Sequence, residues 1–457
     1  MVAKVGVAKV GITKVGEETS VQTGLATENE ASSASEGRRK FLKTAAVSAG
    51  AAAASGMIDG FPLVWSQTMK DVKLVQVGGS YSAIKEIAEQ ATKDLGFKVE
   101  MQTAPHDALL NRLVTQPQSI DIADIEYFFQ LHLLPRATLH PIDLKKIKLW
   151  DKVVPIFTKG EYPDGRKVST QGVLPFEVQY IEKPGDKKFA TKPTGLATGI
   201  PTVYNADTLG IRPDLVKRKI ESWSELLNPE WKGKTSIVSV PGIGIMDAAM
   251  AIEARGDIKY ADKGNMTKAE IDKTIEILIQ AKKAGQFRAF WGTFDESVNL
   301  MAAGETVVQS MWSPAVTAVR SRGISCYYAP LKEGYRAWAS CIAPMAHLKG
   351  PKLDAAYAYL NWYMDGWQGG FIAKQGYYSS VPETAKKFMT ADEYGFWYEG
   401  KPAKGEIRDP FGNLMEKAGS VRDGGAFWDR MGKVACWNTL MDESRYMVTK
   451  WNEFLAA

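Results

Sequence analysis

A strand-like segment followed by a helix-like segment recurs along most of the chain from residue 73 onward, and this repetition narrows the fold to one class. The short apolar run KLVQVG at 73–78 is typical of a buried strand. The segment at 80–96 then places its apolar residues on one helical stripe and ends at a glycine. The same order returns across 97–127 and again across 234–323. Repeated units of this kind predict an α/β fold with largely parallel sheets.

Residues 1–66 differ from the rest and indicate an export region. The stretch at 36–56 has two arginines, then Phe41 and Leu42, then a weakly apolar run rich in alanine. That run is too short and too mild to span a bilayer, which takes roughly twenty apolar residues. Its letters RRKFLK resemble the twin-arginine signal R-R-x-F-L-K, so we expect export by the twin-arginine translocase and cleavage near Ser66. The alternative is a basic helix start on a cytosolic protein.

The composition and the positions of the cysteines limit which class of protein this can be and which partners it can have. A hydrophobic content of 45% is typical of a soluble globular protein, and a net charge of +5 without a basic stripe gives no footprint for nucleic acid. About 390 of the 457 residues follow the export region, which suits two domains. The first cysteine is Cys326, so we expect no lipid anchor and a free monomer in the periplasm. Cys326 and Cys341 either form a disulfide or, with Cys436, remain buried thiols.

Five segments follow predicted strands and are therefore candidates for a binding site. Ligands of open α/β sheets bind beyond the carboxyl ends of the strands. The segments that fall there are GGSYS at 78–82, EYFF at 126–129, VPGIGI at 240–245, SMWSP at 310–314 and AWAS at 337–340.

Four longer motifs resemble, in the right order, those of the spermidine/putrescine-binding family of periplasmic receptors for ABC importers. SWSELLNPEWKGK at 222–234 is similar to the family pattern S-W-x-x-L-x-x-P-x-[YW]-K-G. MAAGETVVQSMWSPA at 301–315 resembles its helix–Gly–Glu–strand–Trp segment. APLKEGYRAWASCIAP at 329–344 resembles its P-x-E-G and W-x-D hinge strand, and KQGYYSSVPETAKK at 374–387 its Gly-Tyr turn.

The resemblance implies a type II periplasmic-binding-protein fold, in which two α/β lobes joined by crossover hinge strands close on a ligand. Each lobe would hold a mainly parallel sheet flanked by helices. On this basis the first lobe comprises 72–199 plus 340–382, and the second comprises 200–339 plus 383–457. The implied partners are a small-molecule ligand and an ABC transporter permease in the inner membrane.

The resemblance also implies an aromatic cage around the ligand. Aromatic rings attract ammonium groups through their negative faces, and carboxylates accept charge-assisted hydrogen bonds from them. Carried across position by position, the ligand-binding residues are Tyr81, Trp312, Trp338, Tyr377 and Asn438. The alternative for each is packing in the core.

The carboxylates of the family pattern are replaced in this chain. The acidic position of W-x-D is Ser340, which we keep as a ligand-binding candidate, and the family's acidic loop is VPGIGI. Glu126, at the end of a predicted strand, is expected to restore one negative charge, and Asp247 is a second candidate.

The replaced acidic loop suggests an anionic end on the ligand. Gly242 and Gly244 open a predicted helix, whose first N–H groups and positive dipole end attract anions. We therefore predict a small nitrogen compound that is cationic at one end and anionic at the other, such as an amino acid or a betaine.

Two other classes remain open. Ferric-ion receptors on a similar fold use paired tyrosines near the place of Trp312, whereas the pairs here begin at Tyr327 and Tyr377 on different segments. An exported enzyme is the other alternative, but the chain has no C-x-x-C, H-E-x-x-H, G-x-S-x-G or P-loop motif, and its four histidines are scattered. We expect a receptor that does no chemistry and uses no metal or cofactor.

Overall fold

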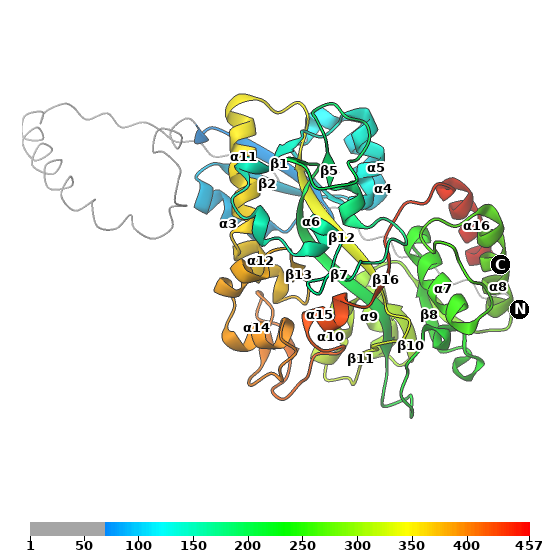
Figure 1. Cartoon of the computed structure of the whole chain (residues 1–457). Helices are drawn as coiled ribbons and strands as arrows, with labels where there is room; N and C mark the ends of the chain where they lie inside the picture. The colour runs from blue at the N-terminus through cyan, green and yellow to red at the C-terminus, as the bar shows by residue number, and fades with distance from the viewer. Residues whose placement is uncertain (1–68) are drawn as a thin grey trace, which may run out of the picture. The chain divides into compact units, whose positions relative to one another are not determined.

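The computed structural model describes residues 69–457, apart from the side chains of residues 106 and 107. The predicted export region, with the twin-arginine motif and the expected cleavage site at Ser66, lies outside the described residues (Figure 1). Within the described part, no helix has both the length and the apolar character needed to cross a membrane.

The first lobe is built on three parallel strands in the predicted order. The central strand β1 pairs with β2 on one side and with β3 on the other. The strands and the helices that connect them are β1 (Lys73–Gly78), α3 (Lys85–Leu95), β2 (Lys98–Thr103), α4 (His106–Thr115) and β3 (Ile122–Glu126). Helix α3 ends at Gly96, whose φ of 75° is left-handed and favours glycine. The carboxyl ends of β1 and β3 therefore meet at one edge of the sheet.

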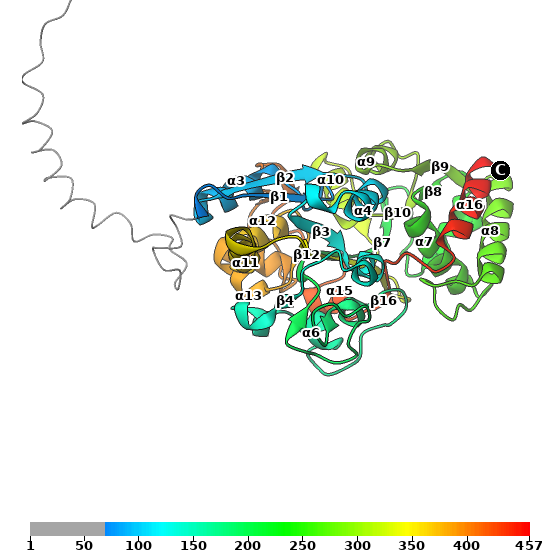
Figure 2. The ribbon, with the colours of Figure 1, turned by 90° about the horizontal axis from the view of Figure 1, so that it is seen from above.

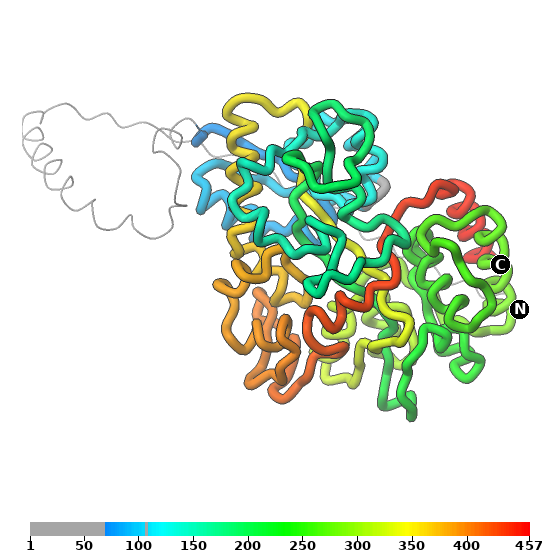
Figure 3. The backbone as a smooth tube through the Cα atoms, viewed as in Figure 1, coloured from blue at the N-terminus to red at the C-terminus, as the bar shows by residue number. Residues whose placement is uncertain are grey.

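The second lobe repeats this arrangement around parallel strands β8, β9 and β10. β8 pairs with β9 and with β10. The elements are β8 (Thr235–Val238), α7 (Pro241–Arg255), α8 (Lys268–Lys283), β9 (Phe287–Trp291), α9 (Phe294–Ala302), β10 (Val308–Met311) and α10 (Ser313–Ser321). Helix α8 begins with a capping box, in which Thr267 and Glu270 bond each other's backbone N–H. The C-terminal helix α16 (Ser444–Ala456) returns to pack beside α7 and α8 (Figure 3).

Two long strands connect the lobes. β7 (Ile200–Ile211) and β12 (Tyr335–Pro344) run antiparallel to each other, and every residue in both is buried. β12 also pairs with β3 of the first lobe, and β7 with β10 of the second, so a single hydrogen-bonded path crosses both lobes. Figures 1 and 2 show the two strands running between the helices of one lobe and those of the other. The fold is thus the predicted two-lobe α/β fold. Its antiparallel pairs include those where the lobes join and those of two small separate sheets.

The remaining elements cover the crossing strands and the first lobe. The longest of them is α11 (Gly350–Met364), whose apolar residues pack on the first lobe. The others are β4 (Ile142–Asp143), α5 (Gln130–Leu133), α6 (Pro155–Lys159), β5 (Tyr180–Ile181), β6 (Leu196–Ala197), β11 (Tyr327–Tyr328), α12 (Trp367–Ala373), β13 (Tyr378–Ser379), α13 (Pro382–Ala385), α14 (Ala391–Trp397), β14 (Ile407–Arg408), β15 (Leu414–Glu416), α15 (Phe427–Met431) and β16 (Val434–Trp437). The two small separate sheets are β4-β6-β5 and β14-β15. All three cysteines are free and buried, so of the two alternatives the one with three buried thiols is confirmed and Cys326 does not pair with Cys341.

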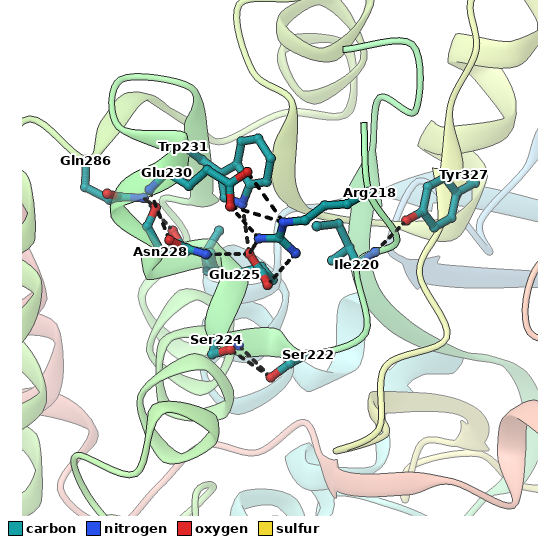
Figure 4. A network of polar contacts seen from close by, with 11 residues as sticks. Arg218, Ile220, Ser222, Ser224, Glu225, Asn228, Glu230, Trp231, Gln286 and Tyr327 are labelled. Carbon is teal, nitrogen blue, oxygen red and sulfur yellow. Dashed lines mark hydrogen bonds and ion pairs between the residues drawn. The ribbon is translucent and has the colours of Figure 1, made fainter. Parts of the chain in front are cut away.

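The motif SWSELLNPEWKGK forms a packed turn in the second lobe. Its predicted short helix is a 3-10 helix at Trp223–Leu227. Glu225 accepts hydrogen bonds from Trp231 Nε1 at 2.9 Å and from Asn228 Nδ2 at 2.9 Å, and Arg218 binds it with two further donors (Figure 4). Arg218 also contacts Glu230. The motif therefore stabilises the lobe rather than the cavity.

We expect Glu225→Ala to lower the free energy of unfolding by about 1–3 kcal/mol, because it leaves the donors of buried Trp231 and of Asn228 without their acceptor. The matched change Glu230→Ala should cost only about 0–1 kcal/mol, since that carboxylate is 48% exposed and its pairing with Arg218 is screened by water. Urea unfolding of the two variants measures the difference. Equal losses would show that the Trp231 contact contributes nothing.

Candidate ligand-binding site

A cavity of about 590 Å³ lies where the lobes and the crossing strands meet. The turn after β1, the end of β3, the start of α7, the start of α9 and the turn before β13 all contribute to its wall. Its lining residues are Gly79, Ser80, Tyr81, Ile84, Ala104, Pro105, Glu126, Asn205, Asp207, Val240, Ile243, Gly292, Phe294, Trp312, Pro314, Arg336, Trp338, Gln375, Tyr377 and Asn438. The volume is large enough for a small organic molecule.

Three of the predicted aromatic residues form one continuous wall. Trp338 stands at the centre, with the Tyr81 ring edge-on at 4.9 Å between centroids and the Tyr377 ring edge-on at 5.9 Å. Trp312 faces the cavity from the second lobe and packs edge-on against Trp291 at 4.8 Å. The rings therefore come from both lobes and from a crossing strand.

Glycine and Ser340 place the Tyr81 ring. A Cβ at Gly79 would lie 2.5 Å from that ring, so the glycine lets the ring fold back over its own turn. The Tyr81 hydroxyl contacts Ser340 Oγ at 3.0 Å. Ser340 was predicted to bind the ligand, but its side chain is fully buried behind Tyr81. Its observed contact is with the cage and not with the cavity.

The floor of the cavity is one face of the two crossing strands. Arg336 pairs with Asp207, and Trp338 pairs with Asn205, across the antiparallel β12–β7 ladder. Residues two apart on a strand share a face, so all four side chains point the same way. We did not predict Asn205, Asp207 or Arg336. A signal was present, because Arg336 stands two residues before Trp338 in an otherwise apolar strand.

Arg336 binds carboxylates from two elements. Its Nε donates to Asp247 Oδ1 on α7 at 2.7 Å, and its Nη2 lies 3.4 Å from Asp207 Oδ2 on β7. Asp247, predicted as a second source of charge for the ligand, is thus the partner of a buried arginine. Burial raises the pKa of Asp207 to about 6, although Arg336 and the Tyr328 hydroxyl both act to lower it.

Glu126 and Asp207 give the cavity an acidic lining. Glu126 stands at the end of β3, directly across the ladder from Ser340, and is 4% exposed. Behind it, burial raises the pKa of Asp124 to about 7, against the hydrogen bonds from Ser82 and Gln76. Burial, followed by the charges of Glu126 and Asp124, holds the pKa of Tyr81 well above its usual value, so Tyr81 is a neutral phenol.

The predicted anion nest at the start of α7 has little free capacity. Pro241 has no N–H, and the N–H groups of Ile243 and Gly244 both donate to Val240 O, at 3.1 and 2.8 Å. Val240 and Ile243 line the cavity with their side chains. Gly244 instead packs against α16, where an added Cβ would lie 2.3 Å from the Trp451 ring. Gly244 is therefore better explained by packing against α16 than by anion binding.

We expect Gly244→Ala to lower the free energy of unfolding by about 1–3 kcal/mol, because the methyl group overpacks the contact with Trp451. The matched change Gly242→Ala should be neutral or slightly stabilising, since its Cβ would meet only Thr439 O at 3.9 Å. Urea unfolding tests both. A larger loss for Gly242→Ala would contradict this packing.

The tyrosine pairs that begin at Tyr327 and Tyr377 do not come together in one site. Tyr328 donates to Asp207 at 3.0 Å beneath the floor, while the Tyr327 hydroxyl accepts from Ile220 N. Tyr377 lines the cavity and Tyr378 is buried beside it. Among the described side chains of residues 69–457, which leave out residues 106 and 107, no three or more His, Cys, Asp or Glu are arranged to hold a metal ion.

Comparison with known proteins places the chain in a family. The model of the bacterial extracellular solute-binding protein family matches residues 86–394, and the chain belongs to that family. Among curated proteins, none matches the sequence.

Solved structures show the same fold at low identity. The spermidine/putrescine ABC transporter substrate-binding protein PotD from Streptococcus pneumoniae is 14% identical, with a TM-score of 0.55 over 84% of this chain and 97% of that one. The Atu4243-GABA receptor is 16% identical, with a TM-score of 0.52 over 84% and 97%. The periplasmic binding protein AgtB from A. tumefaciens R10, in complex with agropinic acid, is 15% identical, with a TM-score of 0.50 over 84% and 99%.

Proposed function

We propose that the protein is the periplasmic substrate-binding protein of an ABC importer, and that it captures a small amine-containing solute in the cavity between its lobes. The solute would be delivered unchanged to a permease in the inner membrane. The ligand would contact Tyr81, Glu126, Trp312, Trp338 and Tyr377. The lobes would divide as the sequence predicts, at 199/200, 339/340 and 382/383.

The observation that carries this proposal is an aromatic wall beside an acidic floor. Trp338 and its two tyrosine neighbours offer ring faces or edges, while Glu126 and Asp207 offer carboxylates that line the same cavity. Arg336 is paired with Asp247 and Asp207, so it does not supply an uncompensated positive charge. An ammonium group fits such surroundings better than an anion does.

The charges around the cavity also bear on whether the solute is a cation or a zwitterion. The sequence suggested a zwitterion, with its anionic end at α7, but most N–H groups of that turn are already bonded to Val240. We therefore favour a cationic amine over a zwitterion as the solute. Neighbours of this fold include a receptor for spermidine/putrescine and one for GABA, so both chemistries occur on it.

Calorimetric titration of the purified protein with three matched compounds tests the proposal. Putrescine carries an amine at both ends, γ-aminobutyrate carries an amine and a carboxylate, and butyrate carries the carboxylate alone. We expect putrescine to bind most tightly and butyrate not to bind. Mass spectrometry of the denatured protein would identify a retained solute, and a solute without an amine would overturn the proposal.

The route to the periplasm is part of the proposal. RRKFLK supports export through the twin-arginine translocase, and the lack of an early cysteine supports a free monomer. Replacing both arginines of that motif, Arg38 and Arg39, with lysine should leave the precursor in the cytoplasm. Cell fractionation would show this.

A further inference from the structure

The cavity floor contains a directed chain of hydrogen bonds that ends on Glu126. Arg336 Nη1 donates to Asn438 Oδ1 at 2.8 Å, and Asn438 Nδ2 donates to Glu126 Oε2 at 3.0 Å. The exposed fractions of Arg336, Asn438 and Glu126 are 2%, 8% and 4%. Both donors therefore point along the chain toward the carboxylate, inside a region where hydrogen bonds are strong.

Arg336 determines which way the Asn438 amide faces. An asparagine amide can in principle be turned end for end, but a guanidinium has only donors. Asn438 must therefore present its oxygen to Arg336, which leaves its NH₂ group for Glu126. The backbone fixes the position as well, because Asn438 N donates to Ala337 O at 2.8 Å.

Arg336 is itself held from two sides. Asp247 on α7 binds its Nε at 2.7 Å, and Asp207 on β7 lies 3.4 Å from its Nη2. The chain of contacts thus begins on a helix of the second lobe, passes through the crossing strands and ends on β3 of the first lobe. No freely rotating group separates Asp247 from Glu126.

We propose that Asn438 is a positioning residue, which keeps Glu126 ionised and aimed at the solute, and that Arg336 fixes the amide for this task. The inference depends on the proposed function and deepens it, because it assigns the cationic end of the solute to Glu126. A hydrogen bond donated to a carboxylate favours its charged form. Asn438, predicted from sequence to contact the ligand, then acts mainly through Glu126.

The groups around Glu126 show why such a donor is needed. Among the described side chains, the titratable and charged groups around Glu126 include Tyr81, Asp124, Asp207, Asp247, Arg336 and Tyr377. Three of them are carboxyl groups, which oppose a further negative charge, and burial opposes it too. Without the amide, Glu126 would hold its proton to a higher pH.

The first experiment needs no ligand. The change Asn438→Leu removes the donor, and Thr439→Val in the same loop is the control. The urea midpoint lost by Asn438→Leu should be larger near pH 8 than near pH 5, because a raised pKa of Glu126 in the folded state costs stability only above its unfolded value of about 4.3. Thr439→Val should lose the same at both pH values. An equal loss for Asn438→Leu at both would overturn the proposal.

The second experiment counts protons on binding. Putrescine and γ-aminobutyrate are titrated near pH 6.5 in two buffers of different ionisation heat. Asn438→Leu, and also Asn438→Asp in case the leucine variant folds poorly, should release up to about one more proton per bound amine than the wild type, because the cation drives a protonated carboxyl to ionise. As the pH rises from 6.5 to 8, the affinity of these variants for the amine should increase by about ten times more than the affinity of the wild type does.

The outcomes separate the two proposals. Variants with weaker binding but the proton count and pH profile of the wild type would show that Asn438 contacts the solute directly, which overturns the positioning role. If neither amine binds the wild type, the proposed function fails, whereas the pH dependence of the urea midpoint still decides the role of Asn438.

Discussion

Arg336→Ala is expected to lower the free energy of unfolding by about 3–5 kcal/mol at neutral pH, because it leaves two buried carboxylates without their shared partner. Asp207 and Asp247 are each about 1% exposed. Because both carboxyl groups are buried, removing the guanidinium takes away their paired charge and leaves little solvent to replace it. Urea unfolding monitored by tryptophan fluorescence measures the loss.

The pH dependence of this loss has a definite sign. In the folded protein the pKa of Asp207 is about 6, above its value of about 3.9 in an unfolded chain. Folding therefore takes up a proton between these values, and this group makes the protein less stable as the pH rises through them. Removing Arg336 raises the folded pKa of Asp207 further, so the variant keeps a proton at pH values where the wild type has lost it. The penalty of Arg336→Ala should therefore be smaller below about pH 6 and should grow as the pH rises above that value.

The exposed Arg322, which bonds Asn299 at 2.8 Å, gives a matched control. Arg322→Ala should change the free energy of unfolding by less than about 1 kcal/mol at every pH. A penalty for Arg336→Ala that stays constant from pH 4 to pH 8 would contradict the assigned ion pairs.

Glu126→Gln is expected to weaken binding of the tightest amine by about 1.5–3 kcal/mol, which is roughly 10–150-fold. The change keeps the shape of the side chain and an oxygen for Asn438, but it removes the charge that would accept from the ammonium group. Calorimetric titration with putrescine measures the loss, and the unfolding midpoint should stay the same or rise.

Glu305→Gln is the control for this change, since Glu305 is 43% exposed and pairs with Arg288. Its affinity for putrescine should match that of the wild type. Unchanged affinity in Glu126→Gln would show that the cationic end of the solute lies elsewhere, with Asp207 as the next carboxylate to replace.

Strands and helices of both lobes could be predicted from sequence because their patterns are local. KLVQVG is a short apolar run that is typical of a buried strand. Thr267 and Glu270 form a helix cap that needs no tertiary contact. The aromatic residues of the cavity wall were predicted from the resemblance to the spermidine/putrescine-binding family. Tyr81, Trp312 and Trp338 also lie in segments expected beyond strand ends, where α/β sheets bind ligands.

The floor of the cavity could not be found in the same way. β7 and β12 are buried on both faces, so their sequences do not alternate between polar and apolar residues, and no periodicity shows which side chains face the cavity. Only the register, with Arg336 opposite Asp207, brings those charges together. The anion nest was expected from two glycines, whereas the backbone bonds to Val240 that limit it are visible only in three dimensions.

Trp338, which would contact the solute, and Asp207 and Arg336 of the cavity floor lie on the two strands about which the lobes would move. Any bend of β7 against β12 changes the spacing of Asp207, Arg336 and Trp338, so affinity and the open–closed balance share one set of atoms. A designer who swaps these side chains to accept a new compound would also reset the opening motion, and a sensor built on this scaffold is better retuned from the rim at Ile84 or Phe294.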